Sequence, residues 1–522
     1  MNNNYLKLII FFFISFFLLS PILIIFFQGI YSINNINNLY APRYILGSSK
    51  LIFLVSVVVL LISIPLAWVN TMTNFWGRKF IQIFCILPLG VPAFISAYTY
   101  AEILEPGGYL SIYLSNFYGF SIRNTLFASI ILGLSLFPYV YLLTRIAIIN
   151  FSARFIEAAK TMGKTPWQCF FKICIPMALP GIAAGLALAL METINDFGVA
   201  DFFGLQTLTI GVFQYISTIN DLPSAFSLSL IILVIMILLY VFEQKMRGGR
   251  KFNNSSYESI RWSRYQLNRS KTILVFILSF LPIFFGFFIP LIFNFFIFIT
   301  NFQIIDYSNF LSSVYNSIIL GGFVGFFCVL VSIFINFYSR FSRSKKFLYY
   351  KKIINMGYAL PGVVIALGVL IFLKYVNHFL QFTILATFIG LVLALIISLI
   401  SISNNSIDSG LDKIGKSIDD ASRLMGRRSS TTYFRVIIPQ IRLSVLAGFL
   451  LVFVDTIKEL PITLLLRPFN FNTLATSLYE YSSNEMFENG SLHALTIILF
   501  LSLVIYFFDS VIEKKQNSKI LK

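Results

Sequence analysis

The chain has 522 residues, of which 58% are hydrophobic and 11% are charged, with a mean hydropathy of +0.84 and a formal net charge of +18. A soluble domain carries roughly 25% charged residues, so this composition excludes a soluble protein and indicates a protein of the lipid bilayer. The basic residues lie between apolar segments, which points to membrane topology and not to a nucleic-acid partner. The cysteines and histidines form no metal-binding pattern, so we assign no metal ligands and expect no disulfide framework.

Apolar segments of the first half predict six membrane spans, read as helices because lipid offers the backbone no hydrogen-bond partner. The first run, 6–27, is too long for a cleaved signal peptide and lacks a small-residue cleavage site, so we expect an uncleaved span that starts in the cytoplasm. Pro88 with Pro92, and Pro361 with Gly362 in the second half, predict bent or broken helices that help a gate move, with tight packing as the alternative. Segment 104–123 is expected to be an outer loop. The remaining spans are expected at about 51–69, 80–103, 124–148, 177–197 and 224–242.

Residues 243–271 are expected to form a cytoplasmic linker, because eight Lys and Arg side chains there face only two Glu. Six more spans are expected at about 272–299, 314–337, 353–376, 383–403, 442–464 and 491–510. The even number of spans places both termini in the cytoplasm. The predicted fold is therefore an all-α membrane protein with about 12 transmembrane helices in two similar six-span halves, 1–242 and 272–522, with cores at about 48–242 and 313–510.

One stretch of sequence occurs twice, once in each half, between long apolar segments. Its landmarks keep a constant offset, since 420 − 157, 426 − 163 and 439 − 176 all equal 263. The span count and the Lys/Arg distribution independently place both stretches, 150–176 and 405–440, in the cytoplasm. The landmarks are Glu157, Ala158, Ala159, Gly163 and Pro176 in the first copy, and Asp420, Ala421, Ser422, Gly426 and Pro439 in the second.

Each copy predicts a helix, a turn and a second helix. In the first copy Gly163 is expected to end the first helix, and Thr165 to cap the second with Pro166 in its first turn. In the second copy Ser429 or Ser430 is expected to take the capping role. An ordinary amphipathic surface loop is the alternative for either copy alone. Two copies in register on one side of the membrane favour a shared role over that alternative.

These residues resemble the signature loop of permease subunits of binding-protein-dependent ABC importers, E-A-A-x3-G-x9-I-x-L-P. The departures are Ile175 and Ile438 in place of Leu, and Asp-Ala-Ser at 420–422 in place of Glu-Ala-Ala. The resemblance covers almost the whole chain, because both halves share the six-span plan. It implies the type I importer permease fold, and it implies that each loop carries a short coupling helix that docks into a separate ATPase subunit.

The resemblance extends to the solute. Two fused permease units, with Asn195-Asp196-Phe197-Gly198 and the runs 458–461 and 465–469, look most like ferric-iron importers, while thiamine, phosphonate and polyamine importers stay alternatives. The resemblance implies a transport subunit of the bacterial inner membrane with no catalytic residues and no cofactor. Its implied partners are a periplasmic binding protein and an ABC ATPase homodimer that uses ATP. A 12-span secondary transporter is the rival of another class, and no cluster of acid, base and nucleophile supports a membrane enzyme.

Residues 410–417 fit the phosphate-binding loop pattern G-x4-G-K-[ST]. That loop works between a strand and a helix, where its amides surround phosphates, whereas here a membrane span precedes it. The repeat aligns it with 147–154, which holds neither glycine nor lysine. We therefore expect no nucleotide site in this chain.

Four carboxylates lie in the predicted spans or at their ends, in two pairs with the 263-residue offset: Glu192 with Asp455, and Asp196 with Glu459. A carboxylate deep in a span costs about 2.5–3.5 kcal/mol on insertion scales, so it normally faces the bundle interior or a watery path. One hypothesis is that the four line the solute pathway, where hard oxygen ligands suit ferric ion. The alternative is that they bond to backbone or to a neighbouring helix and hold the bundle together, or lie at its outer edge near the bound receptor. Lys458 beside Glu459 favours this alternative for Glu459.

Overall fold

A computed structural model gives the fold. The residues left undescribed include parts of the predicted outer loop 104–123, of both predicted coupling loops (150–152 and 416), of the linker, and of the first residues of the ninth predicted span. The described part is almost wholly helical. Its only strands are the two-residue β1 (Thr73–Asn74) and β2 (Tyr265–Gln266), which pair in parallel. The described residues are 3–33, 41–110, 122–149, 153–248, 264–341, 351, 354, 360–381, 383–415 and 417–520.

The helices follow the repeat in the sequence. In the first half they are α1 (Asn3–Tyr31), α2 (Ala41–Met72), α3 (Arg78–Phe84), η2 (Leu87–Gly90), α4 (Ala93–Leu104), α6 (Thr125–Ala147), α7 (Ala153–Thr161), α8 (Pro166–Cys169), η4 (Phe170–Cys174), α9 (Ile175–Asn195), α10 (Gly198–Phe202), α11 (Leu208–Ser217) and α12 (Leu222–Gly248). In the second half they are α13 (Arg269–Ile283), η5 (Phe284–Phe288), α14 (Ile289–Thr300), α15 (Tyr307–Phe341), α17 (Gly362–Leu380), α18 (Phe388–Leu411), α19 (Ser417–Leu424), α20 (Ser429–Thr432), η7 (Tyr433–Ile437), α21 (Ile438–Gln440), α22 (Arg442–Lys458), α23 (Pro461–Leu466), α24 (Leu474–Ser483) and α25 (Phe487–Ile520).

Nine helices of the described part are long and apolar enough to cross a membrane, and two bent pairs raise the number to eleven. These eleven overlap the second to twelfth predicted spans, one for one. The first predicted span overlaps α1, in which Phe16–Tyr31 forms a shorter apolar helix. The 90° bend between η2 and α4 confirms the break predicted from Pro88 and Pro92. The all-α, two-half architecture is thus the predicted one.

The ninth span begins later than predicted. The expected start was residue 353, but α17 begins at Gly362, with Pro361 as its extended N-cap. The ring of a proline removes the N–H donor and disfavours helical geometry in the residue before it. The helix start therefore falls at the bend or break that Pro361 and Gly362 predict, whereas the expected start at 353 followed the apolar run; residues 355–359 lie outside the described part.

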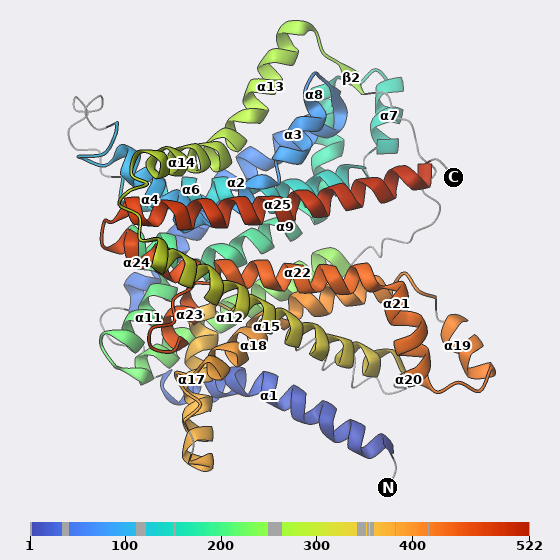
Figure 1. Cartoon of the computed structure of the whole chain (residues 1–522). Coiled ribbons are helices and arrows are strands. Elements are labelled where there is room, and N and C mark those ends of the chain that lie inside the picture. Colours follow the sequence, from blue (N-terminus) through green and yellow to red (C-terminus); the bar gives the residue numbers. More distant parts are fainter. Residues whose placement is uncertain are drawn as a thin grey trace. The chain divides into compact units, whose positions relative to one another are not determined.

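The chain forms two compact units that exchange segments between the sequence halves. Unit 1 comprises Met1–Ala41, Gly211–Val234 and Asp306–Glu480, and unit 2 comprises Pro42–Ile210, Ile235–Ile305 and Tyr481–Lys522. In unit 1, α1 packs on α17, where the rings of Phe17 and Phe372 meet edge to face at 5.4 Å. In unit 2, α25 lies beside α14 (Figure 1), and these two helices of the second half pack on η2 and α4 of the first half. The core of each half is thus packed against outer spans of the other half.

The repeat can be followed contact by contact in the two cores. In unit 2 the Ser63 hydroxyl donates to the Phe137 carbonyl at 2.8 Å, and in unit 1 Ser332 makes the matching bond to Ile400 at 3.5 Å. The offset is 263 between the acceptors (400 − 137) but 269 between the donors (332 − 63). The repeated sequence motif defines only the offset of 263. The offset of 269, which matches residues of α2 with residues of α15, comes from the structure.

Glycines bring α9 close to α6 in unit 2. A Cβ atom added at Gly181 would lie 2.8 Å from the Leu143 carbonyl oxygen, and one at Gly185 would lie 2.7 Å from the Cα atom of Val140. Small residues let membrane helices approach this closely, where dispersion contacts replace the missing hydrophobic drive. The span that follows the first coupling loop is thereby packed tightly against its neighbour.

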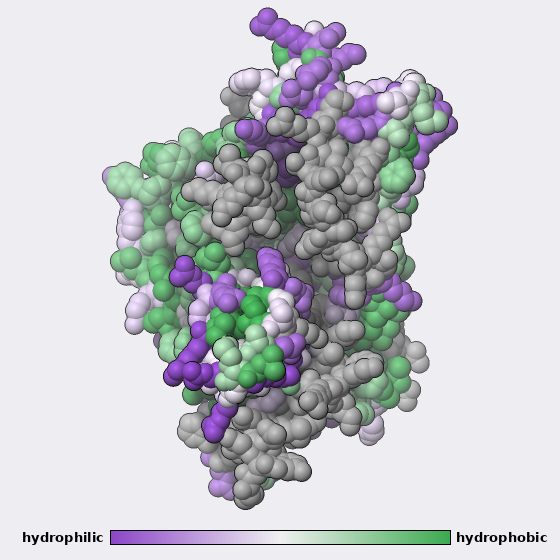
Figure 2. Space-filling model, turned by 90° about the vertical axis from the view of Figure 1, so that its right-hand side faces the viewer, coloured by the Kyte–Doolittle hydropathy of each residue, from purple (hydrophilic) through white to green (hydrophobic). Residues whose placement is uncertain are grey.

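Apolar side chains cover much of the surface. On α2 the side chains of Leu46, Phe53, Val57 and Leu61 are exposed along one helical face. Figure 2 shows broad green areas of this kind between purple patches. Monomeric soluble proteins rarely expose such continuous apolar surface, whereas hydrocarbon lipid solvates it.

Candidate functional site

The first repeated loop begins with α7, which ends in a left-handed turn. Gly163 has φ +76°, a conformation that costs a non-glycine residue free energy. Its N–H donates to the Lys160 carbonyl at 3.0 Å, and the Lys164 N–H donates to the Ala159 carbonyl at 3.0 Å. These are the paired bonds of a Schellman cap, and they confirm the predicted helix end.

The second loop has the same turn 263 residues later. Gly426 has φ +71°, its N–H donates to the Arg423 carbonyl at 2.9 Å, and the Arg427 N–H donates to the Ser422 carbonyl at 3.1 Å. Each donor and acceptor is the counterpart of one in the first loop. The two turns therefore share one backbone shape.

The second helix of each loop starts at matching positions with different caps. Thr165 accepts the Gln168 N–H at 3.4 Å, and the Gln168 side chain accepts the Thr165 N–H at 3.2 Å, so the predicted cap is a full capping box. In the second loop the N-cap is Arg428, without a side-chain bond, and the predicted capping by Ser429 or Ser430 is wrong. Arg428 matches Thr165 in the repeat (428 − 165 = 263). The position within the repeat, and not the type of side chain, therefore sets the start of the helix.

The loops expose matched apolar side chains that the sequence motif does not include. Met162, just before the first capping glycine, is 76% exposed, and its counterpart Met425 is 72% exposed. Phe171 and Phe434, also 263 residues apart, are exposed as well. Flexible, polarizable methionines are common on surfaces that contact other proteins. These four residues keep the constant offset of 263, which is the signal in the sequence that pairs them.

The motif residues occupy equivalent faces of α7 and α19. Ala158 and Ala421 are exposed, whereas Ala159 and Ser422 are buried against the rest of their loops. The acidic landmarks differ, since Glu157 is half-buried and Asp420 is exposed. The prolines that close the motifs, Pro176 and Pro439, are both exposed at the first turn of α9 and in α21. Each loop thus presents one small, accessible helical face.

A buried ion pair fixes the second loop to the end of α15. The Arg340 Nε atom lies 2.8 Å from an Asp419 carboxylate oxygen, and the side chains are only 10% and 9% exposed. The same guanidinium donates to the carbonyls of Leu411, Ile414 and Gly415 at 3.2–3.4 Å. Charge-assisted bonds of a planar guanidinium hold geometry well. No local sequence pattern predicts this pair, because its partners lie 79 residues apart.

The segment 410–417 does not have the surroundings of a phosphate-binding loop. Gly410 lies inside α18, and a Cβ atom there would come within 2.6 Å of the Ser444 hydroxyl of α22. The glycine therefore serves close helix packing, and the segment follows a helix, not a strand. Lys416 lies outside the described residues. That the chain binds no nucleotide stays a prediction.

Two of the four predicted carboxylates cap short helices at the ends of spans. Asp196 accepts the Val199 N–H at the start of α10 at 2.9 Å. Glu459 accepts the Ile462 and Thr463 N–H groups at the start of α23 at 2.8 and 3.0 Å. A carboxylate at a helix N-terminus satisfies orphan donors and the helix dipole. Their geometry fits the structural alternative; a role in the solute pathway stays a prediction.

The other two carboxylates lie inside spans. Asp455 pairs with Lys458 on the next turn of α22 at 2.7 Å. Glu192, its counterpart on α9, is half-buried and also has an interaction partner. No group of three or more His, Cys, Asp or Glu residues within the described ranges is close enough to hold a metal ion. Whether these two residues touch the solute is untested.

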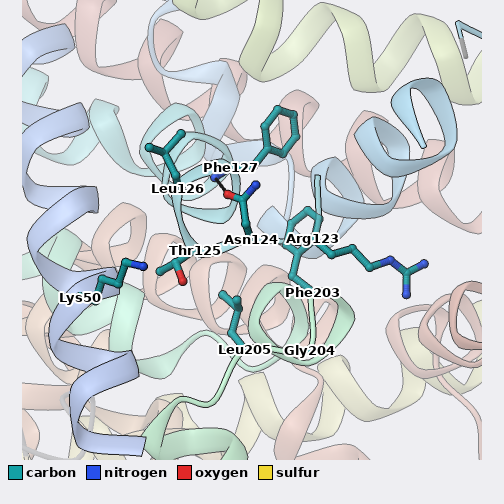
Figure 3. A pocket seen from close by; sticks show the side chains of 9 residues that line it. All are labelled: Lys50, Arg123, Asn124, Thr125, Leu126, Phe127, Phe203, Gly204 and Leu205. Carbon is teal, nitrogen blue, oxygen red and sulfur yellow. Dashed lines mark hydrogen bonds between the residues drawn. The ribbon is translucent and has the colours of Figure 1, made fainter. Parts of the chain in front are cut away.

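A cavity of about 520 Å³ in unit 2 lies at the N-terminus of α6. In Figure 3 the Lys50 side chain points toward Thr125, and that of Arg123 extends away from Lys50. Arg123 is paired with Glu105 at 2.6 Å, and this hydrogen bond raises the pKa of the arginine. None of the predicted pathway carboxylates lines the cavity. The lining residues are Lys50, Arg123, Asn124, Thr125, Leu126, Phe127, Phe203, Gly204 and Leu205.

A duplicated bundle of apolar spans, with one matched helix–glycine–helix loop per copy, defines a multi-pass membrane transport protein. The family described as "Binding-protein-dependent transport system inner membrane component" matches residues 60–248 and again 329–518. The chain belongs to this family and carries its domain twice. It is therefore the permease component of a transport system and a multi-pass protein of the inner membrane.

Curated relatives place the chain among permeases for several solutes. It is 25% identical to the Fe(3+)-transport system permease protein FbpB 2 of Haemophilus influenzae. The alignment spans 477 residues and covers 90% of each chain. It is 30% identical to the molybdenum transport permease ModB of Haemophilus influenzae, over 31% of this chain and 76% of the relative. It is 28% identical to the spermidine/putrescine permease PotB of the same organism, over 48% of this chain and 97% of the relative.

Proposed function

We propose that this permease imports a solute under the control of a separate ATPase, which grips the loops 157–176 and 420–439. The supporting observation is the pair of identically capped turns, each with an exposed methionine before its glycine. A loop that only connected two spans would have no reason to keep backbone shape, register and exposed apolar side chains through a 263-residue repeat. Short helices that enter a partner's groove commonly present such a face.

The two loops join the spans that follow them in different ways. In the first copy α8 runs through the π-helical segment η4 into α9, so Pro166–Asn195 is one continuous helical span. In the second copy a bend of 74° separates the loop helix from α22. Closure of an ATPase dimer on both loops would move each following span as a unit and produce alternating access by rocking. Both termini lie in the cytoplasm in this scheme.

A co-purification experiment tests the ATPase partner. The full chain, solubilised from its native membrane, is expected to bring down an ATPase subunit, and solute uptake is expected to stop when ATP is depleted with the proton gradient intact. Uptake that persists without ATP and collapses with the gradient would instead identify a secondary transporter.

Ferric iron is the solute that we propose. Support comes from the ferric permease relative, whose similarity extends over nine-tenths of both chains, whereas the molybdenum and polyamine permeases match a third to a half of this chain. Hard carboxylate oxygens such as Glu192 and Asp455 also suit a hard cation. The experiment is to identify the solute that the cognate receptor binds; a receptor that binds an oxyanion or a polyamine would refute the iron assignment.

A second pair of matched loops follows α9 and α22, at the ends of these spans opposite to the coupling loops. They are 203–207, between α10 and α11, and 467–473, between α23 and α24, and the second of them has the features of a receptor contact. In both copies this loop re-enters the bundle at the same anchor: Leu208 donates its N–H to Ser48 at 2.8 Å, and Leu474 donates to Ser317 at 2.8 Å. Loop 203–207 of the first copy turns tightly at Gly204, whereas loop 467–473 of the second copy is longer. The extra length belongs to the second copy alone.

The longer loop holds an aromatic side chain out in solvent. Phe469 is 93% exposed, while Arg467 binds both Asn472 and Glu480, and the Asn316 side chain binds the Asn472 carbonyl at 2.9 Å. A loop tied down by this network keeps the exposed ring in place at little entropic cost on binding. Because α22 separates this loop from the second coupling loop, we propose that Phe469 contacts the solute receptor outside the membrane.

A further inference from the structure

The first coupling loop lacks the ion pair that anchors the second. The residue that matches Asp419 is Ile156 (419 − 263), which has no charge. The residue that matches Arg340 on the preceding helix is Thr71 (340 − 269), by the offset that the Ser63 and Ser332 contacts define. Neither member of the pair is present, so α2 and α7 need a different connection.

The end of the linker supplies a connection to α2. Strand β2 pairs in parallel with β1, with Tyr265 opposite Thr73. The Asn74 amide donates to the Gln266 side chain at 3.3 Å. Arg264 donates from Nε to the carbonyl of Thr71 at 3.3 Å. An arginine from the linker thus binds the position on α2 where the second copy has its own arginine on α15.

The same linker segment also contacts α7. The Lys160 ammonium lies 4.0 Å from the centroid of the Tyr265 ring, within cation–π distance. The Tyr265 ring also contacts the ring of Trp68 on α2, with 6.4 Å between the two ring centroids. Partial burial lowers the pKa of Lys160. One tyrosine therefore touches both the helix that leads into the membrane and the helix of the coupling loop.

We infer that residues 264–266 are a strap that positions the first coupling loop, with Arg264 and Tyr265 doing for α7 what Arg340 does for α19. The strap belongs to the linker between the two permease repeats, so the linker is part of the coupling apparatus and not only a tether. The claim that α7 transmits force from an ATPase rests on the proposed function. The claim that the strap holds α7 in place is independent of it.

Hydrogen exchange of the full chain in lipid nanodiscs tests the strap without any partner. Tyr265→Ala is expected to speed amide exchange in Ala153–Thr161 about ten-fold, the scale of a partly desolvated cation–π contact, and to leave Ser417–Leu424 unchanged. Arg340→Gln is expected to give the reverse pattern, so each loop serves as the control for the other. Tyr265→Phe keeps the ring and is expected to behave like the wild type.

A cross-link separates loss of the strap from general unfolding. In an Arg264→Ala background, which removes the bond to Thr71 and is expected to speed exchange in Ala153–Thr161, Asn74→Cys with Gln266→Cys is expected, once oxidised, to slow that exchange back toward the wild-type rate, because pinning β2 on β1 keeps the Tyr265 ring on Lys160. Peptides of α6 and α9 report whether the core is intact. Unchanged exchange of Ala153–Thr161 in Tyr265→Ala, or equally faster exchange in both loops, would overturn the inference whether or not an ATPase binds.

Discussion

Arg340 and Asp419 form a buried ion pair at 2.8 Å that joins the end of α15 to the second coupling helix. Removal of one partner from a buried pair leaves an unpaired charge, which typically costs about 3–5 kcal/mol. Arg340→Ala is therefore expected to lower the thermal unfolding temperature in detergent and to stop uptake. The double variant with Asp419→Ala is expected to recover much of the stability, because no charge is then stranded. A double variant no more stable than Arg340→Ala would show that the pair is not the anchor.

Gly163 is expected to be intolerant of proline although nothing crowds it. Its φ of +76° is closed to the proline ring, and its N–H bond to the Lys160 carbonyl would be lost. Gly163→Pro, like the charge reversal Glu157→Lys, is expected to abolish uptake while the protein still reaches the membrane. Gly322→Ala, at a helical glycine with open space around it, is the matched control and is expected to be neutral. Wild-type uptake by Gly163→Pro would refute the docking role of the loop.

The sequence predicted the bundle well, because apolar runs and basic connections follow directly from the physics of the bilayer. It also predicted the capping glycines, since a left-handed turn selects glycine almost alone. It did not predict the Arg340–Asp419 pair or the contact of Tyr265 with Lys160. Those contacts join residues far apart in the chain. No local sequence pattern around a surface lysine or a linker tyrosine indicates which residue it contacts. The wrong serine cap shows the same limit, because backbone register and not side-chain preference decided it.

Met162 and Met425 are expected to be the main apolar contacts with the ATPase. Burying each exposed side chain on docking would contribute about 1.5–3 kcal/mol, so Met162→Asp with Met425→Asp is expected to prevent co-purification of the ATPase. Circular dichroism and membrane yield should stay unchanged, since both residues are exposed. Substitution of exposed Leu61 by Ala, on the apolar face of α2, is the control. Undiminished co-purification with both methionines replaced would move the contact elsewhere.

Two substitutions of Glu459 distinguish its role as a helix cap from a role as a ligand in the solute pathway. Its two carboxylate oxygens accept N–H groups of Ile462 and Thr463. Glu459→Gln keeps an acceptor but removes the charge, whereas Glu459→Ala removes both and is expected to cost about 1 kcal/mol of stability. If capping is the role, uptake by the Gln variant should stay within about two-fold of the wild type. Loss of uptake by the Gln variant at wild-type stability would instead indicate that the charge faces the solute.

Phe469 is expected to affect the receptor and not the ATPase. The ring is almost fully exposed on a loop held by Arg467, Asn472 and Glu480, so its removal should leave the fold intact. Aromatic anchors at interfaces commonly contribute 2 kcal/mol or more, so Phe469→Ala is expected to weaken receptor binding about thirty-fold in a nanodisc binding assay. Co-purification of the ATPase should be unchanged, which makes this variant the reciprocal control for the methionine pair. Gln206→Ala, on the shorter loop of the first copy, is expected to have a smaller effect; an equal loss from both substitutions would show that the longer loop has no special role in docking.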